Sequence, residues 1–130
     1  MTSCGLWPRP RGLVAVLIDD SGHTRSITVA PTDDARWGLV QRLAATEADL
    51  VVDVALLEAD PLASIALRAG VTVWIADSPL VAALRAAAGI VHRGAHLSAT
   101  LLARLPAIPW LRSQLRRLDS PEDERQIKLL

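Results

Sequence analysis

The sequence predicts an α/β protein with a mixed β-sheet, in which antiparallel strands come first and strand–helix–strand units follow. Two observations predict this class. Residues 13–30 hold apolar, β-branched runs separated by turn residues, a pattern typical of antiparallel strands. From residue 50 onward, short apolar runs alternate with stretches of helical periodicity, which favours parallel strands joined by right-handed crossovers. The chain has 130 residues and is 51% hydrophobic, enough for one compact core.

The first strands are predicted from composition and turn chemistry. LVAVLI (13–18) is rich in strand-forming residues and runs into DDSG (19–22), a turn sequence. TRSITVA (24–30) follows, so the two segments predict a hairpin. TSCGLW, just before Pro8, is expected to form a third antiparallel strand.

A helix is expected after this hairpin. Thr32 is placed to cap its first turn, where Asp33 and Asp34 favour the positive end of the helix. One face of this helix is expected to carry Trp37, Val40, Leu43 and Ala44.

The next segments predict two buried strands, each followed by a helix. LVVDVALL (50–57) is too apolar for a strand with one wet face, and VTVWIA (71–76) resembles it. Asp60-Pro61 is expected to open the helix that Gly70 ends, as N-cap and first helical residue. Ser78-Pro79 is expected to open a helix that Gly89 closes.

The last third predicts helices. One helix is expected at about 95–105, ended by Pro106, and another from Pro109 onward. The second helix would carry Trp110, Leu111, Leu115 and Leu118 on one side, outside the core. We therefore expect a domain over residues 1–105 and a helical extension over 106–130.

This order of elements is that of an RNase H-like fold. Small Rossmann-like and flavodoxin-like domains compete with it, but they begin with a strand–helix–strand unit where this chain begins with a hairpin.

Charge is unevenly distributed along the chain. Residues 19–77 contain ten acidic and four basic residues, whereas residues 78–118 contain six arginines and no acidic residue. Such a segment favours binding to nucleic acid phosphates or to an acidic protein. The arginines are Arg85, Arg93, Arg104, Arg112, Arg116 and Arg117.

Other composition features exclude several classes. A single cysteine, Cys4, forms no disulfide within the chain. The longest apolar run is far shorter than the ~20 residues that span a bilayer, and the N-terminus lacks the pattern of a secretory signal. We expect a cytoplasmic protein with no membrane partner. No nucleotide-binding or zinc-binding motif is present, so no small-molecule cofactor is expected.

Five segments resemble the N-terminal, RuvC-like domain of DEDD-type insertion-sequence transposases, in order and without gaps, from residue 5 to about 105. They are GLWPRPRGLVAVLIDDSG (5–22), LVVD (50–53), PLASIALRAG (61–70), IADSP (75–79) and RGAHLSATLLA (93–103). The last resembles the family helix that carries two catalytic aspartates. The resemblance implies an RNase H-like fold, degenerate and truncated, because the family's larger C-terminal domain with its serine nucleophile has no counterpart.

The resemblance also places the family's four catalytic carboxylates. They fall on Trp7, Asp53, Ala95 and Ser98, so only the second position keeps an acid. Such sites cut DNA with two Mg²⁺ ions ~3.5–4 Å apart, whose charge the carboxylates offset. An indole, a methyl group, a hydroxyl and one aspartate cannot do this. The resemblance therefore implies a lost Mg²⁺ site, and we expect Trp7 to close the pocket.

The first hypothesis is thus a catalytically inactive RNase H-like domain from a mobile-element ancestor, which binds nucleic acid or an acidic partner through its arginines. One alternative is a homodimer formed through residues 106–130, with no role in nucleic acid binding. Another is residual metal-dependent nuclease activity, with Asp53 assisted by Asp19, Asp20 or Glu58.

Overall fold

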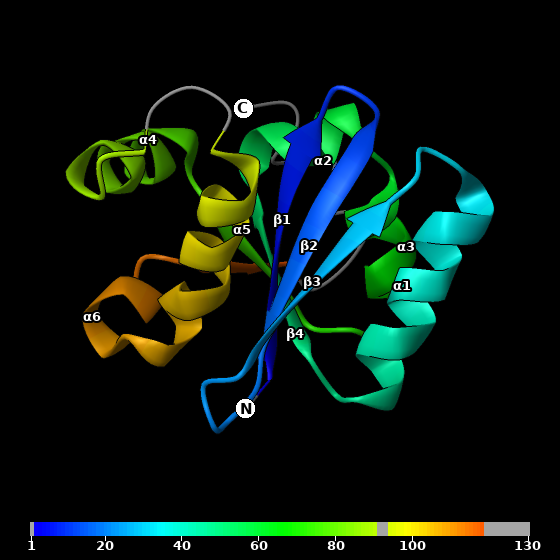
Figure 1. Ribbon diagram of the computed structural model, residues 1–130. Coiled ribbons are helices and arrows are strands. Elements are labelled where there is room, and N and C mark those ends of the chain that lie inside the picture. Colours follow the sequence, from blue (N-terminus) through cyan, green and yellow to red (C-terminus); the bar gives the residue numbers. More distant parts are fainter. Residues whose placement is uncertain (1, 91–93, 119–130) are drawn as a thin grey trace.

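The computed structural model describes residues 2–90 and 94–118, and these form one α/β unit around a mixed sheet (Figure 1). The six strands lie in the order β3-β2-β1-β4-β5-β6. They are β1 (Ser3–Arg9), β2 (Gly12–Ile18), β3 (Thr24–Val29), β4 (Asp49–Asp53), β5 (Val73–Ala76) and β6 (Arg116–Leu118). The helices are α1 (Asp33–Ala45), α2 (Val54–Ala59), α3 (Leu62–Arg68), α4 (Ser78–Ala87), α5 (Ala95–Arg104), the 3₁₀ turn η1 (Leu105–Ala107) and α6 (Pro109–Arg112).

The sheet combines antiparallel and parallel pairs. β1, β2 and β3 pair antiparallel, β4 pairs parallel with both β1 and β5, and β6 pairs antiparallel with β5. The predicted hairpin, the third N-terminal strand and the mixed α/β sheet are therefore confirmed. β4 and β5 are joined through helices, as a parallel pair requires.

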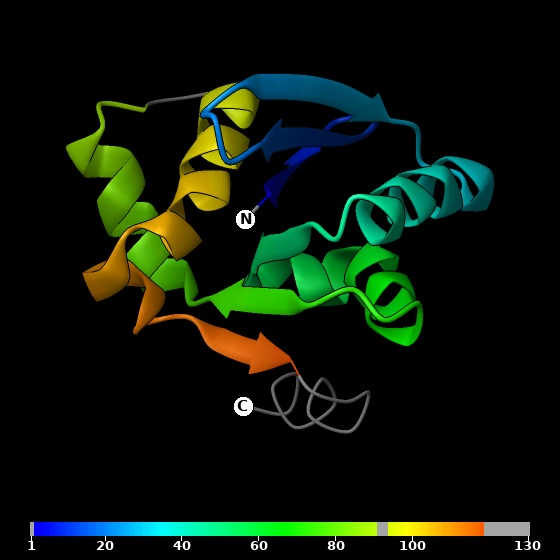
Figure 2. The ribbon, with the colours of Figure 1, turned by 90° about the horizontal axis from the view of Figure 1, so that it is seen from below.

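The helices form two layers, one on each face of the sheet. α1, α2 and α3 lie on one side, and α4, α5 and α6 lie on the other (Figures 1 and 2). Because side chains alternate along a strand, Cys4 and Leu6 of β1 face the first layer, whereas Gly5 and Trp7 face α5.

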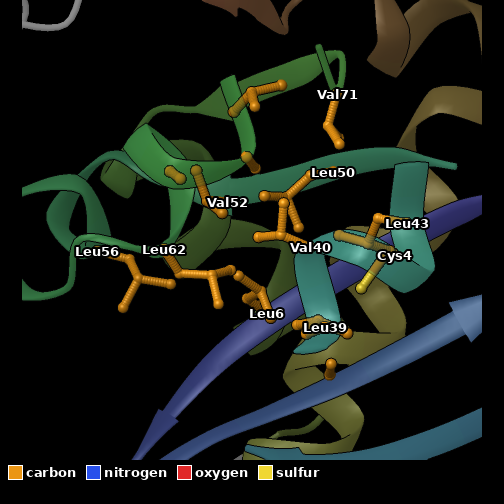
Figure 3. Packing of buried hydrophobic residues seen from close by; sticks show 14 of the residues in the cluster. Cys4, Leu6, Leu39, Val40, Leu43, Leu50, Val52, Leu56, Leu62 and Val71 are labelled. Atoms are coloured by element: carbon orange, nitrogen blue, oxygen red, sulfur yellow. The ribbon is translucent and has the colours of Figure 1, made fainter. Parts of the chain in front are cut away.

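The face that meets α1–α3 carries the main aliphatic core. Leu6 on β1 and Leu50 on β4 are fully buried there, with Val40 and Leu43 of α1 packed against them (Figure 3). Cys4 lies in the same cluster, and burial raises the pKa of its thiol to about 12. A buried, protonated thiol acts as a small apolar side chain.

On the opposite face of the sheet, the backbone of α5 lies very close to β1. A Cβ atom on Gly5 would lie 2.0 Å from the carbonyl oxygen of Ala99 and 2.7 Å from the backbone nitrogen of Ala103. Only glycine lets the backbone of α5 lie this close to β1. The hydroxyl of buried Ser3 donates a hydrogen bond to the Ala103 carbonyl. These contacts fix α5 across β1.

Local capping predictions are largely confirmed. The Thr32 hydroxyl accepts a hydrogen bond from the Ala35 N–H at 3.2 Å and caps α1. Gly70 and Gly89 follow α3 and α4 with positive φ angles of 86° and 72°. α5 ends just before Pro106, as expected.

Two predictions about the middle of the chain are wrong. The expected strand over 50–57 ends at Asp53, because the Asp53 side chain accepts a hydrogen bond from the Ala55 N–H and caps α2. On α1, Val40 is buried as expected, but Trp37 is 48% exposed. Ala44 is exposed as well.

Asp60 acts differently from the expected N-cap of α3. It ends α2, and Pro61 stands at the N-cap position of α3. Its carboxylate still accepts a hydrogen bond from the Leu62 N–H, and it also pairs with the Arg36 side chain at 3.1 Å. Asp60 therefore links α1 to the start of α3.

The expected helix from Pro109 through Leu118 is also wrong. α6 ends at Arg112, and residues 116–118 form β6 on the edge of β5. The edge of β5 has backbone donors and acceptors to satisfy, and pairing with β6 satisfies them.

The three leucines of this segment belong to the core. Leu111, Leu115 and Leu118 are 4%, 7% and 1% exposed. They form no apolar surface outside the core, so the homodimer through residues 106–130 stays a prediction without its original basis. Residues 119–130 lie outside the described part of the chain. No described helix has the length and apolarity needed to cross a bilayer.

Candidate functional site

Trp7 is the centre of the candidate site. It lies near the end of β1, is half-buried, and faces α5. The guanidinium carbon of Arg85 lies 4.7 Å from the centroid of the Trp7 ring, within the range of a cation–π interaction. Arg85 Nε also donates a hydrogen bond to the Ser98 hydroxyl at 2.9 Å. Two contacts therefore fix one cation beside the indole.

Two helices position this cluster. Arg85 lies in the last turn of α4. Ala95 and Ser98 lie at the start of α5 with a spacing of three, which places them on the same side of the helix. Ala95 and Trp7 pack against the same small cluster of buried residues, and Ser98 is fully buried. Ser98 is thus a buried hydroxyl whose partner is a guanidinium.

Asp53 lies on another side of Trp7, at the end of β4. One of its carboxylate oxygens accepts hydrogen bonds from the Ser78 hydroxyl at 2.6 Å and from the Ala55 N–H at 2.9 Å. Asp53 and Trp7 line a small hollow of about 160 Å³. Of the four positions that the transposase resemblance selected, Asp53 and Ala95 each line a hollow together with Trp7, and Ser98 is linked to Trp7 through Arg85.

The residues at these positions do not fit a pair of Mg²⁺ ions. Asp53 supplies one carboxylate, and one of its oxygens is engaged in capping α2 and in binding Ser78. The guanidinium of Arg85 lies against Ser98 and Trp7, where a divalent cation would meet a like charge. Across residues 2–90 and 94–118, no three His, Cys, Asp or Glu side chains group closely enough to hold a metal ion.

The alternative with Asp19 or Asp20 as partners of Asp53 is wrong on geometry. Ile18, just before them, pairs with Ser3 at the start of β1, and Ser3 pairs with Asp49 at the start of β4. Asp53 ends β4, so Asp19 and Asp20 lie at the opposite end of the sheet.

Asp19 instead stabilises the hairpin turn. Its carboxylate accepts hydrogen bonds from the Ser21 and His23 N–H groups at 2.9 and 3.0 Å. Desolvation raises the pKa of Asp19, but these backbone bonds outweigh it and leave the pKa below its usual value. Glu58 is an exposed residue of α2.

A larger hollow of about 640 Å³ opens on the other side of Trp7. Its described lining includes two guanidinium groups, one imidazole and no carboxylate. The expectation that Trp7 closes the pocket is therefore wrong on this side. The residues that line it are Trp7, Pro8, Arg9, Pro10, Val14, Ser26, Arg85, Gly94, Ala95 and His96.

Arg9 is a candidate that sequence reasoning missed. The sequence predicts a strand over TSCGLW that ends before Pro8, but β1 continues to Arg9. Residues two apart on a strand share a face, so Arg9 lines the same hollow as Trp7. The alternation Gly5, Trp7, Arg9 could have indicated this.

The other arginines of residues 78–118 lie in different surroundings. The Arg112 guanidinium carbon is 5.5 Å from the centroid of the Trp74 ring, and Arg116 pairs with Asp77 at 2.6 Å. Arg104 and Arg117 are exposed, and Arg93 lies outside the described residues. Of the five arginines from this segment that the structure describes, Arg85 alone lines the large hollow.

The site therefore combines a fixed cation, a half-buried indole and a carboxylate that serves as a helix cap. Comparison of the sequence with models of known protein families and with curated proteins gives no match. The resemblance to transposases rests on the quoted sequence segments and their order, and it stays a prediction.

Proposed function

We propose that this chain is an RNase H-like domain, related to DEDD-type transposases, that has lost nuclease activity and binds nucleic acid. The strand order β3-β2-β1-β4-β5, with an antiparallel first half and parallel crossovers after it, supports this assignment of the fold. The sixth strand is an addition at the edge.

The observation that carries the proposal is the guanidinium of Arg85 at the place where the resemblance puts metal-binding carboxylates. In a two-metal nuclease, divalent cations hold the scissile phosphate and activate the attacking group. A guanidinium holds a phosphate by charge and paired hydrogen bonds. It does not lower the pKa of a bound water as a metal does. Binding without cleavage is the expected outcome.

The acid-free segment 78–118 supports a phosphate partner over other ligands. Its described arginines Arg104, Arg112 and Arg117 are exposed, and Arg112 is not in an ion pair with a described acid. We propose that these arginines, together with Arg85, attract the phosphates of a nucleic acid electrostatically. An acidic protein is the competing partner, because it offers the same charge.

A gel-shift series tests this proposal. The full chain is mixed with a duplex, a four-way junction or an RNA at salt concentrations from about 0.05 to 0.2 M. We expect the logarithm of the binding constant to fall linearly with the logarithm of the salt concentration, because phosphate contacts release counterions. If the chain does not bind at the lowest salt concentration, or if its affinity does not change with salt concentration, a nucleic acid partner is rejected.

The loss of nuclease activity has its own test. The same substrates are incubated with the chain in Mg²⁺ or Mn²⁺, and no cleavage is expected. Calorimetric titration of each metal should show no saturable heat. Cleavage or micromolar heat that disappears in Asp53→Ala would instead support the alternative of residual metal-dependent activity, with Asp53 as a ligand.

A further inference from the structure

We infer that the large hollow beside Trp7 is a phosphodiester site that binds one backbone phosphate of a nucleic acid through Arg85 and Arg9, without reading the base. This inference rests on the proposed function and gives it a location. It differs from the surface of helix arginines that the sequence predicts, because the hollow includes Arg9 from β1 and one arginine of that set.

Arg85 is held in place before any ligand arrives. Its Nε–H donates a hydrogen bond to Ser98, and its guanidinium carbon lies over the Trp7 ring. These two contacts restrict the rotation of the long Arg85 side chain before binding. The conformational entropy lost on binding a phosphate is therefore smaller. Among the described residues, no hydrogen bond engages its two terminal NH₂ groups, and their fork geometry suits phosphate oxygens.

Arg9 supplies a second charge at the same hollow. It is exposed, and no hydrogen bond or ion pair joins it to another described residue. Asp53 does not offset this charge, because it lines the smaller hollow and its carboxylate accepts from Ser78 and Ala55. The large hollow is therefore a place of positive potential that an anion would stabilise.

The shape of the hollow favours the backbone over a base. Its volume of about 640 Å³ has room for a sugar–phosphate segment. One face of the Trp7 ring is covered by the Arg85 guanidinium, so that face is closed to base stacking. Recognition through phosphate alone tolerates any sequence.

Fluorescence anisotropy with a labelled duplex of mixed sequence tests the inference. The variants Arg85→Gln and Arg9→Gln are compared with Arg68→Gln, which removes an exposed arginine from α3 in the other helix layer. Each test variant should weaken binding about five- to tenfold at low salt and reduce the salt slope by about one. Arg68→Gln should leave the affinity and the salt slope equal to those of the unmodified chain within experimental error.

Arg104→Gln separates the hollow from the helix surface. Arg104 is exposed on α5 and does not line the hollow. If Arg104→Gln lowers the slope while Arg85→Gln and Arg9→Gln do not, the inference is overturned, but nucleic acid binding through the exposed helix arginines stands. If the unmodified chain binds no duplex, junction or RNA, both fail together.

Ser98 serves as a positioning residue, and its role has a separate readout. Ser98→Ala keeps every charge but frees Arg85 Nε. Affinity should fall about two- to threefold with an unchanged salt slope, whereas a loss of slope would contradict the assigned role. Urea unfolding of each variant checks that the fold is intact.

Two competitors decide the chemical source of the anion. Inorganic phosphate at matched ionic strength should displace the duplex only weakly, because it lacks the neighbouring phosphates. A poly-glutamate peptide should not displace it at equal charge concentration. Displacement by the peptide that depends on Arg85 and Arg9 would assign the hollow to an acidic protein and overturn the inference.

Discussion

The two faces of the sheet differ in side chains, although the same strands build both. Toward α1–α3 the strands present large aliphatic residues such as Leu6 and Leu50, which form a continuous core. Toward α4–α6 the central strand presents Ser3, Gly5 and Trp7, and the buried apolar residues divide into two smaller clusters. Burial of apolar area on the first face stabilises the fold. On the second face, the backbone of α5 packs closely against β1, and polar side chains are held in fixed positions.

This difference indicates where function can be placed in such a fold. A face made of interlocked aliphatic side chains tolerates few polar groups, because each would need a buried partner. On the face with small residues, the backbone of α5 lies against the sheet, and space remains beside the Trp7 ring. The fixed guanidinium and the large hollow both lie on this second face.

The largest effect is expected from Gly5→Ala. The added Cβ would lie 2.0 Å from a backbone oxygen of α5, which cannot rotate away. We expect a loss of more than about 4 kcal/mol in the free energy of unfolding, or failure to fold. Gly38→Ala is the matched control, because a Cβ there meets open space on α1. It should stabilise the chain by about 0.5–1 kcal/mol in urea unfolding.

Neighbouring residues of β1 compare the faces directly. Leu6 is fully buried in the aliphatic core, and Leu6→Ala should lower the free energy of unfolding by about 3 kcal/mol. Trp7 is half-buried on the other face, so Trp7→Ala should lower it by about 1–2 kcal/mol despite removing more atoms. Equal losses in chemical denaturation would mean that the two faces contribute alike.

The C-terminal segment offers a sharper contrast. Leu118 on β6 is 1% exposed and Trp110 on α6 is 67% exposed. Leu118→Ala should lower the free energy of unfolding by about 2–3 kcal/mol, whereas Trp110→Ala should change it by less than about 0.5 kcal/mol. Thermal unfolding measures both. If Leu118→Ala leaves the free energy of unfolding unchanged, the result would instead support the sequence-based expectation that Leu118 lies outside the core.

The effect expected to be smallest near neutral pH concerns Cys4. Burial raises the pKa of its thiol from 9.0 to about 12, so the unfolded chain releases this proton at lower pH than the folded chain does. Its contribution to stability is therefore complete below pH 9 and declines as the pH rises toward 12. Cys4→Ala should lack this decline. A thiol reagent at about pH 8 should label the unfolded chain much faster than the native one.

The sequence indicated part of the candidate site before the structure located it. The resemblance selected Trp7, Asp53, Ala95 and Ser98, and in the structure the last three lie near Trp7, with Ser98 linked to it through Arg85. The sequence grouped Arg85 with the other arginines of residues 78–118 and left Arg9 outside the first strand. The contact of Arg85 with Trp7 and Ser98 could not be predicted, because it joins residues that are far apart in sequence, whereas the alternation along β1 could have indicated Arg9.

By itself, the sequence determined the elements that local chemistry controls. Thr32 caps α1, the DDSG turn closes a hairpin, and Gly70 and Gly89 end helices with positive φ, all through atoms a few residues apart. Tertiary structure alone decided the rest. Residues 116–118 became a strand because β5 offered an open edge, and Arg85 met Ser98 because Gly5 lets α5 lie against β1. Those outcomes depend on which surfaces meet, and no local window of sequence contains that information.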